Sequence, residues 1–329
     1  MRFIPAAILV AALPNYHLAA THVLGGDGGW DYLSFDPATK HLFISRSTHV
    51  MVVDPQSGTV VGDIPDTPGV HGIAVADDLG KGFTSNGADG TVTVFDLASL
   101  KVVATIQTGA KNPDGIAYDS VTKRVFTFDG GSNDATAIDA RTNSVVATIP
   151  LGGRPEFPVV DGRGTVYDNI ESTSEIVAID AQSAKIVKRF ALGSCQHPSG
   201  LSMDQVHRRL FTACQGEMGV VDADSGRMVA TLPTGAGTDA TRFDPNTGLA
   251  FASNGRSATL TVVHEDDADH YSVVQNAATV AGARTMELDP STGNVYLVTA
   301  KMTKNPNATS YRDRYHVVPG TFELLTMQP

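Results

Sequence analysis

Seven residues that share one position of a repeated pattern have the clearest potential for chemistry in this sequence. They are Asp31, His71, Asp114, Glu156, Ser199, Asp239 and Arg284. Six of the seven are titratable, although charged residues make up only 18% of the chain. Four carboxylates stand against one arginine and one histidine, so the set favours a cation, either a divalent metal ion or an ammonium group. We therefore expect these residues to form a ligand-binding site.

Two further histidines could extend this set into a metal site. His49 and His197 are expected on the same face as His71, which together with Glu156 gives a candidate set of metal ligands. Imidazoles combined with a carboxylate suit zinc or copper, whereas carboxylates alone suit calcium. No local motif such as His-Glu-x-x-His is present, so a metal site would depend on tertiary placement. The alternative is that these groups are only hydrated, or paired with their neighbours.

Three other residues lie close to this set in the repeated pattern. Trp30, the only tryptophan, is either a stacking platform for a ligand or a packing residue. Arg242 and Glu287 occupy equivalent positions of adjacent repeats, two residues before the end of the first strand. This placement predicts a structural salt bridge between the two repeats.

The elements that must position these residues are short β-strands. Residues 114–153 contain four runs rich in β-branched and aromatic residues, each closed by turn residues, which is typical of a four-stranded antiparallel meander. The unit recurs every 40 to 45 residues, and the ends of its first strands are Asp36, Ala76, Asp119, Asp161, Asp204, Asp244 and Asp289. This period predicts an all-β, seven-bladed β-propeller that occupies residues 15–329 as a single domain.

A short motif opens the second strand of most repeats with an aromatic residue. Examples are Phe83-Thr-Ser-Asn86 and Phe251-Ala-Ser-Asn254. These segments resemble the Tyr-Val-Thr-Asn repeat of the bacterial YVTN (YncE-like) β-propeller family, and the resemblance covers essentially the whole chain after the leader. It implies a periplasmic or surface propeller without assigned chemistry, so it predicts the fold and not a reaction.

The N-terminus contains two different signals. Met1-Arg2 and the apolar stretch that follows predict a signal peptide over residues 1–14, either short or cut at its start, and too short to span a membrane. Residues 16–24, in contrast, align with the fourth strand of the third repeat. We expect them to pair with residues 322–327, so that an N-terminal strand closes the last blade and removes a sheet edge.

The two cysteines support export from the cytoplasm. Cys195 and Cys214 are expected at the same end of the fifth blade, within reach of one another. Their even number and placement predict a disulfide formed in an oxidising compartment, and the alternative is two buried free thiols. Together with the leader, they indicate a periplasmic or secreted protein.

The seventh repeat contains a loop, residues 301–316, that is longer than its counterparts. It would bring aromatic and cationic side chains over the acidic face as a lid, namely Tyr311, Arg312, Arg314, Tyr315 and His316. The alternative is a solvated excursion without structure of its own.

The net charge of the chain and the motifs that it lacks exclude several classes of function. A net charge of -11 argues against nucleic acids and anionic membranes as general partners, and fingerprints for phosphates or dinucleotides are absent. We expect a monomeric propeller that binds a small ligand, a cation or a protein partner at the acidic channel mouth, on the face that carries the long loop. The alternative is a metal-dependent enzyme, a lactonase-like hydrolase or an oxidoreductase, that uses the same carboxylates and histidines with a divalent calcium, zinc or copper ion.

Overall fold

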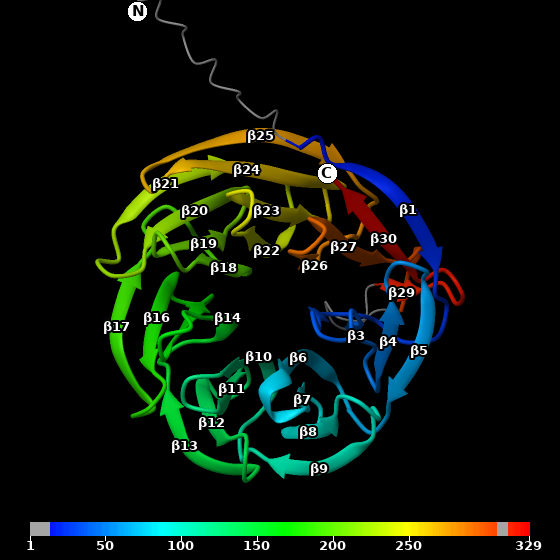
Figure 1. Ribbon diagram of the computed structural model, residues 1–329, viewed down its shortest axis with the longest axis vertical. Helices are drawn as coiled ribbons and strands as arrows, with labels where there is room; N and C mark the ends of the chain where they lie inside the picture. Colours follow the sequence, from blue (N-terminus) through cyan, green and yellow to red (C-terminus); the bar gives the residue numbers. More distant parts are fainter. Residues whose placement is uncertain (1–13, 308–314) are drawn as a thin grey trace, which may run out of the picture.

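The protein forms a closed ring of β-sheets around a central channel (Figure 1). A computed structural model describes residues 14–307 and 315–329. The predicted signal peptide, apart from Pro14, lies outside these residues, as do three predicted lid residues, Tyr311, Arg312 and Arg314. No helix of the described residues has the length and apolar character needed to cross a bilayer.

Six of the sheets are antiparallel meanders of four consecutive strands, with the first strand of each beside the channel (Figure 1). In chain order these blades are β2 (Leu33–Phe35), β3 (Leu42–Ser45), β4 (Val50–Asp54) and β5 (Thr59–Ile64); β6 (Val70–Ala76), β7 (Lys81–Asn86), β8 (Thr91–Asp96) and β9 (Val102–Gln107); β10 (Pro113–Asp119), β11 (Arg124–Asp129), β12 (Asp134–Asp139) and β13 (Ser144–Pro150); β14 (Pro155–Val160), β15 (Thr165–Ile170), β16 (Glu175–Asp180) and β17 (Lys185–Ala191); β18 (Leu201–Asp204), β19 (Arg209–Ala213), β20 (Glu217–Asp222) and β21 (Met228–Pro233); β22 (Thr238–Asp244), β23 (Leu249–Asn254), β24 (Thr259–Asp267) and β25 (His270–Ala278).

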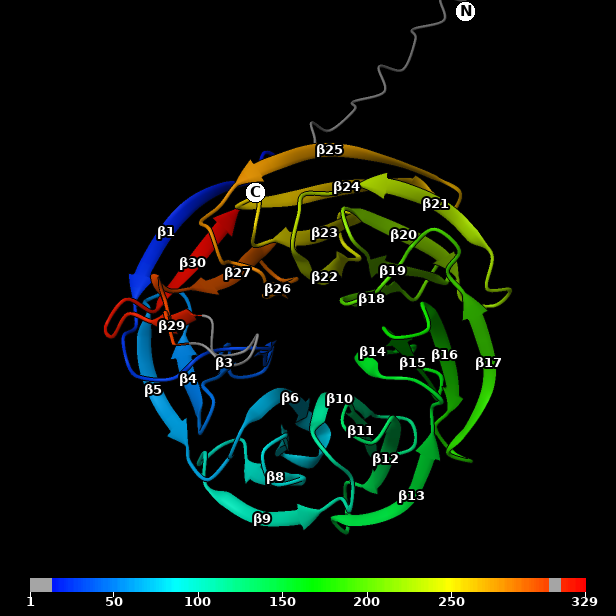
Figure 2. The same cartoon turned by 180° about the vertical axis from the view of Figure 1, so that it is seen from behind.

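The two ends of the chain build the seventh blade. Its strands are β26 (Met286–Asp289), β27 (Asn294–Thr299), β30 (Glu323–Gln328) and β1 (His17–Val23). The outermost strand β1 runs antiparallel to β30, with Val23 opposite Glu323 (Figures 1 and 2). The predicted all-β propeller of seven four-stranded antiparallel blades, closed by the N-terminal strand, is confirmed for the described residues.

Two short elements lie outside this pattern. A single turn of 3-10 helix, η1 (Asp77–Leu79), connects the first two strands of the second blade. In the seventh blade, β28 (Met302–Lys304) and β29 (Tyr315–Val317) pair into a small antiparallel hairpin at the base of the long loop.

Burial explains why the strands are apolar on both faces. Five of the six residues of β11 are buried, because the middle strands of each blade are covered by both neighbouring blades. The aromatic residue that opens the second-strand motif is fully buried, as at Phe83 and Phe251. The outer strands face solvent, and β13 exposes Val145 and Val146. The packing of sheet against sheet therefore supplies the core.

The asparagine of the second-strand motif joins two strands in the interior. Asn86 Nδ2 donates to the hydroxyls of Thr91 and Thr93, at 2.9 Å and 2.8 Å. Asn254 makes the same pair of bonds in the sixth blade, at 3.1 Å and 2.8 Å. In the third blade an aspartate, Asp129, occupies this position. The motif therefore satisfies buried polar groups that would otherwise lack partners.

A buried arginine fixes the segment that follows β1. The Arg46 guanidinium is fully buried and lies 3.7 Å from the centre of the Phe322 ring. It donates hydrogen bonds to four backbone carbonyl oxygens, those of Gly25, Asp27, Gly28 and Gly29. Because this segment leads directly to Trp30 and Asp31, Arg46 positions one side of the channel mouth.

The disulfide predicted from the sequence is present. Cys195 and Cys214 are bonded and both are buried, with their Cα atoms 5.4 Å apart. The bond ties the loop before β18 to the residue that follows β19. This finding decides against the alternative of two free thiols.

Candidate functional site

The seven polar residues singled out in the sequence lie at the start of the innermost strands. His71, Asp114, Glu156 and Asp239 lie within the first strands of their blades, and the other three lie just before them. Irregular register in β6, β10, β14 and β22 interrupts the pairing at this level. Such bulges turn side chains away from the regular alternation, here at the channel. We call this rim of the central channel the channel mouth.

Five of these residues form a continuous series of polar contacts. Asp239 Oδ2 lies 3.0 Å from Arg284 Nη1, and Arg284 Nη2 lies 3.7 Å from Asp31 Oδ1. On the other side of Asp31, its Oδ2 lies 2.7 Å from His71 Nδ1, which is also 3.5 Å from Asp114 Oδ1. Residues far apart in the chain therefore meet across five blades.

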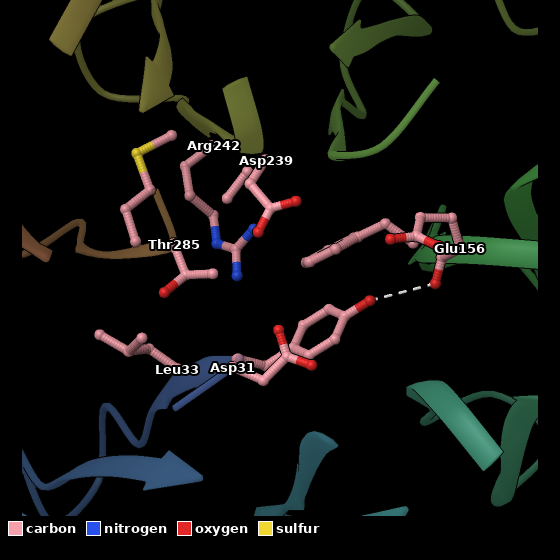
Figure 3. Close-up of a pocket in the computed structure, with 10 residues that line it drawn as sticks. Asp31, Leu33, Glu156, Asp239, Arg242 and Thr285 are labelled. Atoms are coloured by element: carbon pink, nitrogen blue, oxygen red, sulfur yellow. Dashed lines mark hydrogen bonds between the residues drawn. The ribbon is translucent and has the colours of Figure 1, made fainter. Parts of the chain in front are cut away.

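Glu156 and Ser199 lie at the same level but make other contacts. Arg154 pairs with Glu156 at 3.1 Å and with Glu171 at 2.8 Å. The Ser199 hydroxyl donates to the backbone oxygen of Thr238 at 3.1 Å. Figure 3 shows Asp31, Glu156 and Asp239 arranged around one pocket, with Arg242 beside Asp239. Ser199 is therefore satisfied by the backbone, whereas Glu156 faces the shared space.

Burial raises the proton affinity of the carboxylates at the channel mouth. It raises the pKa of Asp114 to about 6, with His71 opposing the shift and Asp31 adding to it. Burial and the nearby Asp114 and Asp239 raise the pKa of Glu156 to about 8. The pKa of Asp239 is also raised, mainly by burial, although Arg284 opposes the shift. Negative charge therefore exceeds what the surrounding cations compensate.

Two functional candidates escaped the sequence reasoning. The Tyr32 hydroxyl donates to the backbone oxygen of Glu156 at 3.2 Å, the bond drawn in Figure 3. Its pKa is raised well above the ordinary value by burial and by the surrounding carboxylates. Asp168 is fully buried, and although the Glu156 backbone approaches it, neither carboxyl oxygen has a well-formed hydrogen bond. Burial raises the pKa of Asp168 well above its ordinary value, with Glu156 and Asp114 adding to the shift.

A signal in the sequence could have revealed Asp168. It follows the aromatic residue of the second-strand motif, the position that holds threonine in three other blades. Those residues are Thr84, Thr127 and Thr212. A carboxylate in place of a buried hydroxyl is a departure that the repeat alone makes visible.

The structure changes the composition of the candidate metal set. One ligand atom each from Asp31, His71 and Asp114 lie within 4.8 Å of one another. His49 lies instead near Asp63 of the outer strand β5, with Nε2 3.6 Å from a carboxylate oxygen. His197 is exposed in the loop before β18. Among the described residues, neither His49 nor His197 belongs to a group of three possible ligands within 4.8 Å, so the predicted set of His49, His71, Glu156 and His197 is not brought together as a compact site.

Trp30 packs between the first and last blades. Its ring lies 5.6 Å from that of Phe322, and it joins the cluster of Leu33 and Leu324. These contacts favour the packing interpretation, although one edge of Trp30 also borders a hollow shared with the hairpin residues Tyr315 and His316. Two of the predicted lid residues therefore lie beside the channel mouth.

The predicted salt bridge between the sixth and seventh blades is present. Arg242 Nε and Nη2 donate to the two carboxylate oxygens of Glu287, at 2.7 Å and 2.9 Å. The guanidinium group also lies 5.0 Å from the centre of the Phe157 ring. Such two-point geometry is the strong form of this interaction and fixes the two inner strands relative to one another.

Comparison with known proteins identifies the fold. No family model matches the sequence, and no curated protein matches it. The WD40 repeats of RRP9 superpose with a TM-score of 0.79 at 11% identity, covering 95% of this chain and 100% of theirs. A chain of Kuenenia stuttgartiensis hydrazine synthase gives 0.74 at 17% identity, with 92% and 99% covered. A chain of the mitotic checkpoint complex gives 0.77 at 12% identity, with 100% and 97% covered. The similarity lies in the fold. At these identities the comparisons show the fold alone, a seven-bladed β-propeller.

Proposed function

We propose that this protein is an exported β-propeller that binds a cation at its channel mouth. The cation is either a divalent metal ion or the ammonium group of a small ligand. The observation that carries the proposal is the meeting of Asp31, His71 and Asp114, from three successive blades, with ligand atoms within 4.8 Å of one another.

Electrostatics supports a positively charged ligand. Carboxylates from four blades lie at the channel mouth, namely Asp31, Asp114, Glu156 and Asp239, and the buried Asp168 lies close enough to Glu156 and Asp114 for their charges to raise its pKa. Arg284 and Arg154 are in direct contact with this set, as is the His71 imidazole, so the carboxylates outnumber the arginines. Low-dielectric walls focus the resulting field, so a bound cation would replace protons on the groups whose pKa is raised.

A second candidate function is metal-dependent catalysis, by a lactonase-like hydrolase or an oxidoreductase. Glu156 favours it, because a carboxyl group with a pKa of about 8 beside a metal-binding set is suited to proton transfer near neutral pH. The bound calcium, zinc or copper ion would polarise the substrate, while Glu156 would move the proton. Loaded protein that hydrolyses a panel of lactones, and loses that activity in Glu156→Gln, would support this function.

The proposed localisation is supported by the disulfide and by the repeat motif. The disulfide Cys195–Cys214 supports an oxidising compartment, the periplasm or the outside of the cell. The resemblance to YVTN propellers is consistent with that location and with a monomer. The hairpin β28–β29 flanks the channel mouth, so a protein partner that engages this face would contact Tyr315 and His316.

The proposal is tested by measuring cation binding to chelator-treated protein at pH 8. Calcium, zinc, copper and choline are titrated by calorimetry, and thermal unfolding is followed in parallel. We expect one of these cations to bind, and Asp114→Asn or His71→Gln to weaken binding at least about tenfold. The exposed Asp63→Asn variant, which removes the same charge far from the axis, serves as the control. Binding that is equal in all variants would refute the proposal.

A further inference from the structure

The turn between the first and second strands contains the same side-chain hydrogen bond in four blades, and the fifth blade (β18–β21) differs from them. In the four blades an aspartate accepts a hydrogen bond from a threonine three residues later. The pairs are Thr39 with Asp36 at 2.6 Å, Thr122 with Asp119 at 2.6 Å, Thr247 with Asp244 at 2.7 Å and Thr292 with Asp289 at 3.0 Å. In the fifth blade the aspartate is Asp204 and the threonine is replaced by His207, whose Nδ1 lies 2.7 Å from Asp204 Oδ2. The aspartate of the turn still has a side-chain partner three residues later, but this partner is the imidazole of His207 in place of a threonine hydroxyl.

The sixth blade (β22–β25) differs from the other blades at a second position. In the other blades this position is the residue that follows the third strand. In the sixth blade the backbone amide of Glu265 donates to Gly248 at 2.9 Å. Four other blades make the same backbone bond from a buried apolar residue, namely Leu97, Ala140, Ala181 and Ala223. The Glu265 side chain is only 3% exposed. A carboxylate therefore occupies a place that the fold otherwise fills with a small or apolar side chain, and burying it needs a compensating partner.

The two departures meet at the interface between the fifth and sixth blades. His207 Nδ1 lies 3.3 Å from Glu265 Oε1, and ligand atoms of Asp204, His207 and Glu265 lie within 4.8 Å of one another. The Tyr271 hydroxyl lies 3.2 Å from Oε1 of Glu265. The other oxygen, Oε2, is buried and has no hydrogen-bond partner among the described residues. An acceptor is thus left open within the cluster.

The side chains of this cluster offer a set of ligand atoms to a cation. Asp204 and Glu265 are each 3% exposed in their side chains, and the His207 imidazole contacts both. Two buried carboxylates with oxygens within 4.8 Å of one another repel each other unless a positive charge lies between them. One imidazole nitrogen with two carboxylate oxygens suits zinc and related transition metals, whereas calcium takes oxygen ligands alone. The His207 side chain is 49% exposed, which leaves a path for the ion and room for water as a further ligand.

We propose that Asp204, His207 and Glu265 form a zinc-type metal site that links the fifth and sixth blades. Because it lies in the turn after the first strand, it is at the opposite end of the blades from the channel mouth. The site is independent of the proposed function. Zinc bound there would join two neighbouring sheets and stabilise the ring, since metal that binds only the folded state adds to its stability.

The repeat itself supplies variants that are expected to fold. His207→Thr and Glu265→Ala each restore the residue type found at that position in other blades. His270→Ala is a matched control, because His270 lies in the same β24–β25 hairpin, is exposed and contacts Asp267 instead. Circular dichroism and thermal unfolding without metal verify that each variant is folded.

Zinc binding to chelator-treated protein is measured at pH 8 by calorimetry and by metal analysis after dialysis, with cobalt as a spectroscopic substitute. We expect the wild type and His270→Ala to bind zinc at this site and to unfold at a higher temperature with it. Both restoring variants should bind at least about tenfold more weakly and lose the thermal shift. Unchanged affinity in the two restoring variants, or no zinc bound by the wild type, would overturn the inference. Zinc binding that is lost in His71→Ala and kept in His207→Thr would also overturn it, because the metal would then lie at the channel mouth.

Discussion

The third blade contains a buried charge where two other blades have a neutral amide. Asp129 occupies the position of Asn86 and Asn254, and it accepts hydrogen bonds from Thr127 at 2.9 Å and Thr136 at 2.8 Å. Its side chain is fully buried, and Asp134 stands opposite it on the neighbouring strand. Because neither bond neutralises the charge, an ionised Asp129 carboxylate destabilises the folded state.

The cost of the ionised Asp129 side chain in free energy of unfolding can be worked out from the shift in its pKa. Burial raises the pKa of Asp129 from an ordinary 3.8 to about 7, although bonds from Thr136 and Thr127 oppose the shift. A group whose pKa is higher in the folded state destabilises the fold as pH rises. Below about pH 4 Asp129 is protonated in both the folded and the unfolded state and costs no stability. As the pH rises toward 7, the unfolded state loses this proton more readily, so the free energy of unfolding falls. A shift of about three units corresponds to at most about 4 kcal/mol.

Asp129→Asn removes the charge and keeps the shape. We expect little change in the free energy of unfolding at pH 4, and a gain that grows with pH to at most about 4 kcal/mol at pH 8. The new amide would donate to Thr136 and to Asp134, as the amides of Asn86 and Asn254 donate to their neighbours. The reciprocal variant, Asn86→Asp, should lose stability over the same pH range.

Urea unfolding at a series of pH values between 4 and 8, followed by circular dichroism and fluorescence, measures these differences. Coincident transitions by the two probes are needed before free energies are compared. Asp63→Asn controls for the change in net charge, because its side chain is 54% exposed. A difference between Asp129→Asn and the wild type that stays constant from pH 4 to pH 8 would refute the electrostatic reasoning.

Three further predictions follow from other parts of the ring. Arg46→Lys should lower the free energy of unfolding by about 3 kcal/mol, because a lysine cannot donate to four carbonyl oxygens at once. Faster proteolysis near residues 25–29 would report the loss. Replacing Cys195 and Cys214 together by serine should cost about 3 kcal/mol in urea unfolding, since the bond closes a separation of 19 residues; an unchanged midpoint would contradict this. Cation affinity at the channel mouth should rise between pH 5 and pH 8, because Asp114 and Glu156, with pKa values of about 6 and 8, lose their protons over this range. A cation affinity that calorimetry finds independent of pH would exclude these two residues as ligands.

The sequence by itself determined the architecture of this protein. Strand propensity and turn residues act locally, so the repeated meanders could be recognised without tertiary information. The regular period then implied seven equivalent sheets, and equivalence alone placed Asp31, His71 and Asp114 on a common rim. The alignment of residues 16–24 with a fourth strand also predicted ring closure, because the pattern of a strand is carried by its own residues.

Only the tertiary structure decided which side chains meet. His71 contacts two carboxylates from neighbouring blades, whereas His49 lies beside Asp63 and His197 is exposed in a loop, because bulges and loop conformations set side-chain positions that the repeat period does not encode. His207 and Glu265 meet for the same reason, through the packing of two blades whose contacting residues are far apart in the chain. A repeat specifies the position of each residue within its own sheet, whereas contacts between sheets depend on how neighbouring faces pack.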